Sequence, residues 1–341
     1  MLRNLRAIGL AAVAALAVTG APARAAEQTW TFQAATSAGD IAFKIMEEFT
    51  DRVALLTGGR LAIELHPVGA VVQYDETLEA VGAGLLDGHV TATVYFSGKD
   101  PAFALLGDLI AAYDHPNQML MFLRYGGGNE LLRELLEPYG LYFIGGANTG
   151  KEAFVSKIPI RGVADFKGVK LRAPEGMAQD IFQAMGAAPV NLPSAEVFTA
   201  VERGVVDAAD WATFSMNHQL GFHNIARYPI YPGIHSMPVI EVSVNLDKWR
   251  ALPPDIQVIL EVAVRDFARD MIQRLELEDL DAVAAARAQG VHVIDWPASE
   301  RQKIRDLAVG IWRDWSGRSP MAARAYRAQT EFLAKIGLID K

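Results

Sequence analysis

Arg172 is the side chain in this 341-residue sequence whose position and chemistry best suit the binding of a ligand. It ends a short run that predicts a strand over Gly168–Arg172, and a helix is predicted soon after it, over Met177–Met185. Ligands of open α/β sheets bind at this carboxyl edge, where helix N-termini favour anions. A guanidinium also offers a planar fork that matches a carboxylate. The position therefore predicts a site for an organic acid, and a solvated arginine in a surface ion pair is the alternative.

Two acids and an indole are predicted near the same edge. Asp210 and Trp211 lie in a predicted strand over Ala208–Thr213, and Glu152 follows Asn148-Thr149-Gly150, where the chain would first cross between lobes. An indole supplies a flat apolar wall, and a carboxylate can accept a bond from a ligand hydroxyl or hold a cation. The alternatives are a core tryptophan beside a helix-capping aspartate, and an exposed loop acid at position 152.

The sequence contains no obvious machinery for catalysis. Cysteine is absent, and the seven histidines lack the spacing of a metal motif. His66, His115 and His235 lie near prolines or turn residues, which favours structural roles. Gly126-Gly127-Gly128 is not followed by the Lys and Ser/Thr of a phosphate loop, and no Gly-x-Ser-x-Gly elbow is present. These observations favour a binding protein, and an exported enzyme acting on a small carboxylate is the alternative.

A segment that occurs twice indicates which elements position these residues. Glu, Ala, Val, Gly and Asp recur at the same offsets in Glu76–Asp87 and Glu196–Asp207. Each copy predicts a short helix that ends at glycine and leads into a strand, the first of them over His89–Phe96. One supersecondary unit used twice predicts two similar lobes with a ligand-binding cleft between them. The alternative is coincidence, because helix-Gly-Val-Asp is a common pattern in α/β proteins.

The chain begins with the features of a secretory signal peptide over residues 1–25. Arg3 and Arg6 precede an apolar run over Ile8–Val18 that is short for a bilayer, and Ala23-Arg24-Ala25 forms a small-x-small cleavage site. This predicts a soluble mature protein in the periplasm, and an uncleaved membrane anchor is the alternative. Without the leader, 29 basic residues stand against 40 acidic ones, a net charge of −11 that argues against nucleic acid as a partner.

The remaining pattern alternates strands and helices, which predicts a mostly parallel α/β sheet. Further strands are predicted over Gln28–Ala34, Arg60–His66, Pro189–Leu192, Val239–Asn245 and His292–Trp296. Further helices are predicted over Ile41–Leu56, Pro253–Gln289, Ser299–Trp315 and Pro320–Ile336. At about 1.5 Å per residue, the helix from Pro253 extends roughly 50 Å and can span both lobes. We predict lobe I from residues 26–150 and about 238–270, lobe II from about 151–237 and 285–310, the spanning helix over 253–289, and C-terminal helices over 311–341.

Several stretches resemble the solute receptors of tripartite ATP-independent periplasmic (TRAP) transporters. Asp165-Phe-Lys-Gly-Val-Lys-Leu-Arg172-Ala-Pro is similar to the family's D-L-K-G-L-K-I-R-x-P, and Glu196–Asp207 is similar to its E-v-y-t-A-L-q-x-G-v-v-D. Shorter pieces resemble the branch that binds α-keto acids and related monocarboxylates, namely Phe96-Ser-Gly-Lys99, Tyr125–Gly128, Gly146–Gly150, Asp210-Trp211, Gly221-Phe222 and Tyr231-Pro-Gly233. The resemblance covers nearly all of the mature chain. It implies a two-lobed fold of the Venus flytrap type that captures an organic acid and passes it to a membrane permease.

The resemblance also implies residue roles. Arg172 matches the carboxylate-binding arginine, and Asp210 with the Trp211 carbonyl matches a metal site that bridges ligand and protein. We expect ligand contacts from Arg172, Trp211, Asp210, Glu152, Asn148, Tyr95 and Phe96, and a sodium or calcium ion at Asp210, Trp211, Glu152 and Glu241. No other cofactor is expected. The branch usually has glutamate at position 210, glutamine at 152 and a second acid near His235, where this chain has Ser236.

The last predicted helix bears on assembly. Ala325, Phe332 and Ile336 lie on one apolar face of Pro320–Ile336. The branch includes dimers that exchange C-terminal helices, so a homodimer through this helix is expected, with packing on its own domain as the alternative. A receptor that serves a sensor protein instead of a permease is a further alternative.

Overall fold

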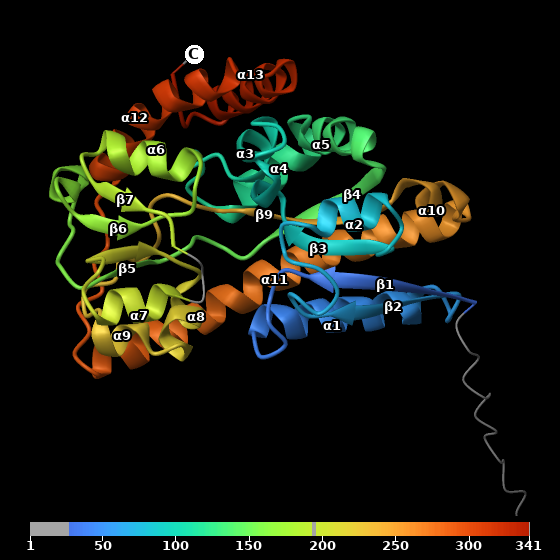
Figure 1. The fold of residues 1–341 in the computed structure, drawn as a ribbon, viewed down its shortest axis with the longest axis horizontal. Coiled ribbons are helices and arrows are strands. Elements are labelled where there is room, and N and C mark those ends of the chain that lie inside the picture. Colours follow the sequence, from blue (N-terminus) through green and yellow to red (C-terminus); the bar gives the residue numbers. More distant parts are fainter. Residues whose placement is uncertain (1–26, 193–195, 341) are drawn as a thin grey trace, which may run out of the picture.

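The computed structural model describes residues 27–192 and 196–340, so the predicted leader lies outside the described residues. Two α/β lobes lie side by side, and helix α11 (Pro254–Ala288) runs along both of them (Figure 1). It packs on strand β4 (Leu141–Asn148) in lobe I and on helix α8 (Phe214–Gln219) in lobe II. The two-lobed class and the spanning helix that the sequence predicts are therefore confirmed. No helix among the described residues is both long and apolar enough to cross a bilayer.

Lobe I is built on a five-stranded sheet in the order β2-β1-β3-β9-β4. Its other strands are β1 (Gln28–Ala34), β2 (Leu61–His66), β3 (Gly88–Ala92) and β9 (Val239–Asn245). Strands β1, β2 and β3 are parallel, whereas β9 is antiparallel to both β3 and β4. Helices α1 (Ile41–Leu56) and α11 share one apolar core with the sheet, and α2 (Thr77–Gly82), α3 (Ala102–Gly107), α4 (Pro116–Tyr125) and α5 (Gly128–Leu136) belong to a second core.

Lobe II contains a smaller sheet in the order β5-β8-β6-β7. Its strands are β5 (Phe154–Ser156), β6 (Lys170–Arg172), β7 (Ala188–Val190) and β8 (Ala208–Asp210). Helices α6 (Met177–Ala184), α7 (Val197–Glu202), α8 and α9 (Phe222–Ile225) surround it. Strand β6 is parallel to both neighbours, β7 and β8, so the carboxyl ends of these strands meet at one edge.

The repeated segment has the same structure in both lobes. Gly84 and Gly204 follow α2 and α7 with φ of 76° and 71°, a conformation that suits glycine. Asp87 then receives the Thr31 N–H of β1 on Oδ2 at 2.7 Å, and Asp207 receives the Lys170 N–H of β6 on Oδ2 at 3.2 Å. Each aspartate thus ties its strand to the parallel neighbour, which explains why it recurs with the glycine.

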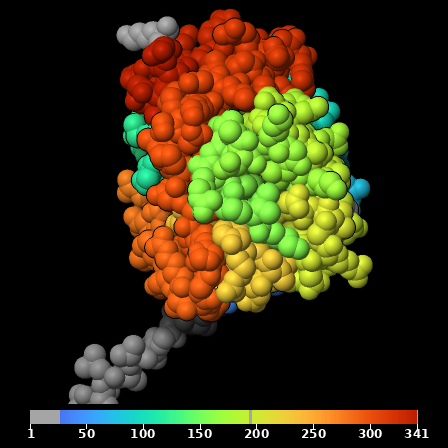
Figure 2. All heavy atoms as spheres, turned by 90° about the vertical axis from the view of Figure 1, so that its left-hand side faces the viewer, coloured from blue at the N-terminus to red at the C-terminus, as the bar shows by residue number. Residues whose placement is uncertain are grey.

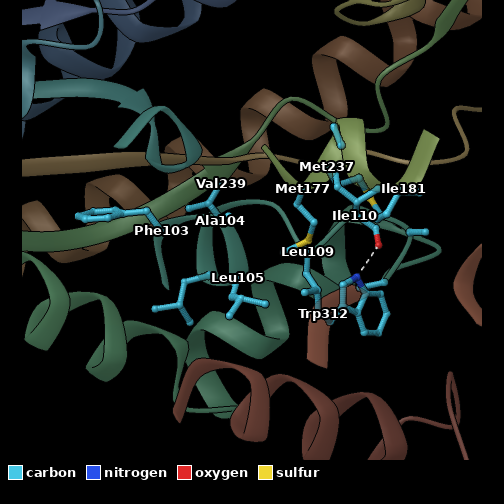
Figure 3. Packing of buried hydrophobic residues seen from close by; sticks show 14 of the residues in the cluster. Phe103, Ala104, Leu105, Leu109, Ile110, Met177, Ile181, Met237, Val239 and Trp312 are labelled. Carbon is cyan, nitrogen blue, oxygen red and sulfur yellow. Dashed lines mark hydrogen bonds between the residues drawn. The ribbon is translucent and has the colours of Figure 1, made fainter. Parts of the chain in front are cut away.

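Two C-terminal helices, α12 (Ala298–Ser316) and α13 (Pro320–Lys335), lie across the ends of the lobes (Figures 1 and 2). The indole N–H of Trp312 donates to the carbonyl oxygen of Ile110 in lobe I at 3.1 Å, beside Met177 and Ile181 of lobe II (Figure 3). The indole N–H of Trp315 donates to Asp180 Oδ2 of α6 at 2.7 Å. Helix α12 therefore joins the cores of the two lobes.

Three predicted strands differ most from the structure. The strand predicted over His89–Phe96 ends at Ala92, because Thr93–Phe96 forms a 3-10 helix, η1. The strand predicted over Ala208–Thr213 ends at Asp210, shortly before Ala212, whose φ of 39° breaks an extended chain. The strand predicted over His292–Trp296 is wrong, since within residues 27–192 and 196–340 this segment forms a single isolated bridge, between Ile294 and Ile230.

Candidate functional site

Arg172 lies at the end of β6 and is held by the adjacent strand. Its Nη1 donates to the carbonyl oxygen of Asp210 at 2.9 Å, and its Nε reaches the carbonyl oxygen of Leu192 at 3.4 Å. The guanidinium also lies 5.3 Å from the centroid of the Trp211 ring. Among the described residues it has no carboxylate partner, so the surface ion pair considered above is not what positions it.

Trp211 follows β8 directly and stands half-buried beside the arginine. Its ring packs on Phe222 with centroids 6.3 Å apart. Its carbonyl oxygen accepts a hydrogen bond from Asn217 Nδ2 at 2.6 Å. The indole is therefore fixed from one side by α9 and through the backbone by α8, which leaves a flat face toward Arg172.

Two acids and a histidine form what we call the acid–histidine cluster: Glu152, Asp210 and His235. One ligating atom from each lies within 4.8 Å of the others. His235 Nε2 is 2.7 Å from Asp210 Oδ1 and 3.9 Å from Glu152 Oε2. Asp210 and His235 are buried, whereas the Glu152 side chain is 22% exposed. The sequence did not predict His235 as a member, because no metal-type spacing surrounds it.

The segments that cross between the lobes bring these residues together. The N–H of Glu152 donates to the carbonyl oxygen of Ser236 at 3.1 Å. A Cβ at Gly233 would lie 1.6 Å from the Glu152 carbonyl oxygen, so only glycine permits this approach. The first segment that crosses between the lobes, residues 149–153, therefore packs on the second one, residues 231–238. His235 belongs to the second segment and contacts Asp210.

The pKa values of the two acids of the cluster are shifted in opposite directions. Burial, with the Asp210 and Asp108 carboxylates nearby, raises the pKa of Glu152 well above its usual value. Burial acts against ionisation of Asp210 too, but His235 and Arg172 hold the pKa of Asp210 below its usual value. Of these two neighbouring carboxyl groups, Glu152 is therefore the more readily protonated and Asp210 the more readily ionised.

Asp108 is a further buried acid beside the cluster that sequence analysis missed. It follows α3, and its Oδ2 accepts a hydrogen bond from Ser236 Oγ at 2.5 Å while its Oδ1 accepts from the Met237 N–H at 3.1 Å. Burial raises the pKa of Asp108 to about 6. No local pattern marks this residue, since its partners lie 128 and 129 positions away in the sequence.

Tyr95 of lobe I lies within electrostatic range of the cluster. It belongs to η1, meets the Tyr74 ring edge-on at 4.9 Å, and is 43% exposed. Burial of its surroundings and the nearby Glu152 carboxylate raise the pKa of Tyr95 to about 12, with Arg172 and Asp210 also in electrostatic range. The phenol therefore keeps its proton at neutral pH and can donate a hydrogen bond across the interlobe site, which we define as Tyr95, Glu152, Arg172, Asp210, Trp211 and His235.

Three of the predicted site residues have other partners. Asn148 uses its side chain in the first crossing, where Nδ2 donates to the Pro238 carbonyl oxygen at 2.8 Å and Oδ1 accepts from the Gly150 N–H at 2.7 Å. Phe96 lies in the core of lobe I, 1% exposed. Glu241 is fully buried between β9 and β3, away from the acid–histidine cluster, so the structure does not bring it to the predicted metal site.

A separate groove of about 650 Å³ lies between α4, β4 and α11 on lobe I. Leu123, Gly145 and Val264 line its floor, and Arg265 and Arg269 lie on its rim. None of the residues of the interlobe site lines it. It is therefore a distinct surface feature.

Two α/β lobes joined by crossing segments, with an arginine, an indole and acids where they face each other, define a two-lobed solute-binding protein. The chain belongs to the family described as bacterial extracellular solute-binding protein, family 7, whose model matches residues 32–317. It is a TRAP-type solute-binding protein of the periplasm. The family is one of binding proteins, not of enzymes.

Known relatives agree with this assignment. A TRAP periplasmic solute binding protein from Rhodobacter sphaeroides, in an apo open structure, is 47% identical, with a TM-score of 0.82 over 92% of this chain and 100% of that one. One from Pseudoalteromonas atlantica, with bound sodium and pyruvate, is 26% identical, with a TM-score of 0.78 over 92% and 95%. The monocarboxylate 2-oxoacid-binding periplasmic protein of a Nostoc species is 26% identical over 85% of this chain and 80% of its own length.

Proposed function

We propose that the protein captures a small α-keto or hydroxy monocarboxylate between its lobes, with the ligand carboxylate on Arg172. The observation that carries this proposal is that the Arg172 guanidinium is held in place but keeps unused hydrogen-bond donors. Asp210 and Trp211 hold it, yet its Nη2 makes no hydrogen bond within the described residues. A held arginine with free donors is suited to a planar carboxylate, because little conformational freedom is lost on binding.

The neighbouring residues support a small ligand with a second oxygen. The face of Trp211 limits the site on one side, and the protonated Tyr95 phenol supplies a donor from the opposite lobe. A keto or hydroxyl oxygen next to the carboxylate would accept such a bond. The Nostoc and Pseudoalteromonas relatives, which bind 2-oxoacids and pyruvate with sodium, support the same chemical class.

We propose a sodium or calcium ion at the carboxylates of Glu152 and Asp210. Hard cations prefer oxygen ligands, and a cation here would take the place of the proton that burial and the nearby Asp210 carboxylate favour on Glu152. The Trp211 carbonyl can add a ligand through its second lone pair. His235, a nitrogen donor, fits better as the group that orients Asp210, at 2.7 Å. Glu241 has no place in this set.

Delivery to a membrane permease is the role of TRAP solute-binding proteins, and we propose it for this chain. A sensor-linked role is the alternative, which adjacent genes for membrane subunits would argue against. The homodimer through α13 stays a prediction. Within one chain, α13 packs on α3, α5 and α12, with Ala325 and Leu333 fully buried.

Two measurements test the proposed function. Native mass spectrometry of protein purified without added ligand should show a copurified small acid. Calorimetry should then show binding of pyruvate or 2-oxobutyrate in calcium buffer, but no binding of acetamide, which lacks a carboxylate. Failure of every α-keto and hydroxy monocarboxylate in such a panel would overturn the ligand class.

A further inference from the structure

We propose that Glu241 and His89 are positioning residues that fix η1 and so hold Tyr95 at the interlobe site. This inference rests on the proposed function and assigns a role to a buried carboxyl–imidazole pair outside the ligand site. His89 Nε2 is 2.8 Å from Glu241 Oε1, and both side chains are fully buried. A buried carboxylate is unfavourable unless it is well paired, so its placement next to η1 calls for an explanation.

The pair contacts η1 at both ends. At its start, Thr93 Oγ1 donates to Glu241 Oε2 at 2.6 Å. At its end, the ring of Phe96 stacks on the His89 ring, with centroids 5.9 Å apart and an interplanar angle of 11°. A single carboxylate and its histidine therefore fix the first and last residues of a four-residue turn.

Helix α3 covers the turn from another side. A Cβ at Gly107 would lie 2.7 Å from the Val94 nitrogen and 2.9 Å from Thr93 Cβ, so glycine permits this close packing. Thr93 and Phe96 are buried, whereas Tyr95 is 43% exposed. These contacts thus fix the turn that carries Tyr95, which lies within electrostatic range of Glu152, Arg172 and Asp210.

The register of the sheet supplies a matched control. Thr91 lies opposite Glu241 in the β3–β9 ladder and is buried, but its hydroxyl has no partner within the described residues and it is not part of η1. Thr91→Val and Thr93→Val therefore make the same chemical change, the loss of a threonine hydroxyl, at two positions two residues apart. Only the second removes a bond that holds Tyr95.

The first test measures pyruvate affinity in calcium buffer by calorimetry. We expect Thr93→Val to weaken binding at least tenfold, Thr93→Ser to stay within threefold of wild type, and Thr91→Val to stay within twofold. In a Tyr95→Ala background, Thr93→Val should change affinity by less than twofold. A loss of equal size in both backgrounds, or no loss in Thr93→Val, would overturn the proposal.

The second test needs no ligand, so it separates this inference from the proposed function. Hydrogen exchange read by mass spectrometry should show the amides of η1 exchanging at least tenfold faster in Thr93→Val than in wild type, with no such change in Thr91→Val. Unchanged exchange of η1 in Thr93→Val, with circular dichroism showing a native fold, would refute positioning. If wild type binds no α-keto acid, the proposed function fails, but this exchange measurement still decides whether Glu241 and His89 hold η1.

Discussion

Replacement of Arg172 by alanine should abolish ligand capture while the fold survives. Without ligand, the Arg172 guanidinium makes one good hydrogen bond, to the Asp210 carbonyl oxygen at 2.9 Å. Its loss should therefore lower the unfolding free energy by only about 1 kcal/mol. The bound carboxylate, in contrast, would lose both partners of a charged fork in a water-poor site. Such a loss is typically on the order of 3–5 kcal/mol, or roughly a hundred-fold to several thousand-fold in Kd.

The assay is calorimetry with the ligand identified by native mass spectrometry. Arg172→Lys keeps the charge but not the fork or the stacking on Trp211, so we expect an intermediate loss. Arg203→Ala removes an exposed arginine of the same lobe and serves as the matched control. An affinity of Arg172→Ala within threefold of wild type would refute the assignment of this residue as the carboxylate anchor.

Three further predictions concern the cation, acid stability and assembly. Exhaustive chelation, or Asp210→Asn, should weaken pyruvate binding, and elemental analysis should find sodium or calcium in wild type; unchanged affinity without bound metal would leave Asp210 as a direct hydrogen-bond acceptor. Burial and the nearby His218 lower the pKa of His223 to about 4, so the unfolded chain binds the extra proton first as pH falls from about 6.5. The contribution of His223 to the unfolding free energy should then drop by about 2 kcal/mol between pH 7 and pH 5. Urea unfolding of His223→Gln should lack that part of the pH dependence. Truncation before Ser319 should expose the apolar partners of α13 and lower the melting temperature, while light scattering of the intact mature chain should report a dimer; a monomer mass would show that α13 packs only on its own chain.

The elements whose bounds the sequence predicted well are those with clear residue signals at both ends. Strands β1 and β9 and helix α1 match the predicted bounds, because alternation or helical periodicity runs up to clear end signals. The ends of β3 and β8 were placed too late. There the chain leaves the sheet for reasons outside the local pattern: Thr93 bonds to Glu241, and Ala212 takes a positive φ.

The same division holds for the interlobe site. Arg172, Asp210 and Trp211 could be predicted because they end parallel strands whose edge is a general binding position. His235 and Asp108 could not, because they reach the cluster through crossing segments whose mutual register no local pattern encodes. Glu241 was misplaced for a related reason. The alternation along β9 predicts which face of the strand Glu241 lies on. Its contact with His89, however, depends on how β9 pairs with β3.

The position of β9 has a consequence for the order in which the chain folds. This strand lies between β3 and β4, yet it follows all four strands of lobe II in the sequence. A chain that emerges amino end first can therefore close the sheet of lobe II while β3 and β4 still present open edges. The sheet that begins the sequence is therefore the last to be completed, and a product that stops before residue 239 should be prone to association through those edges.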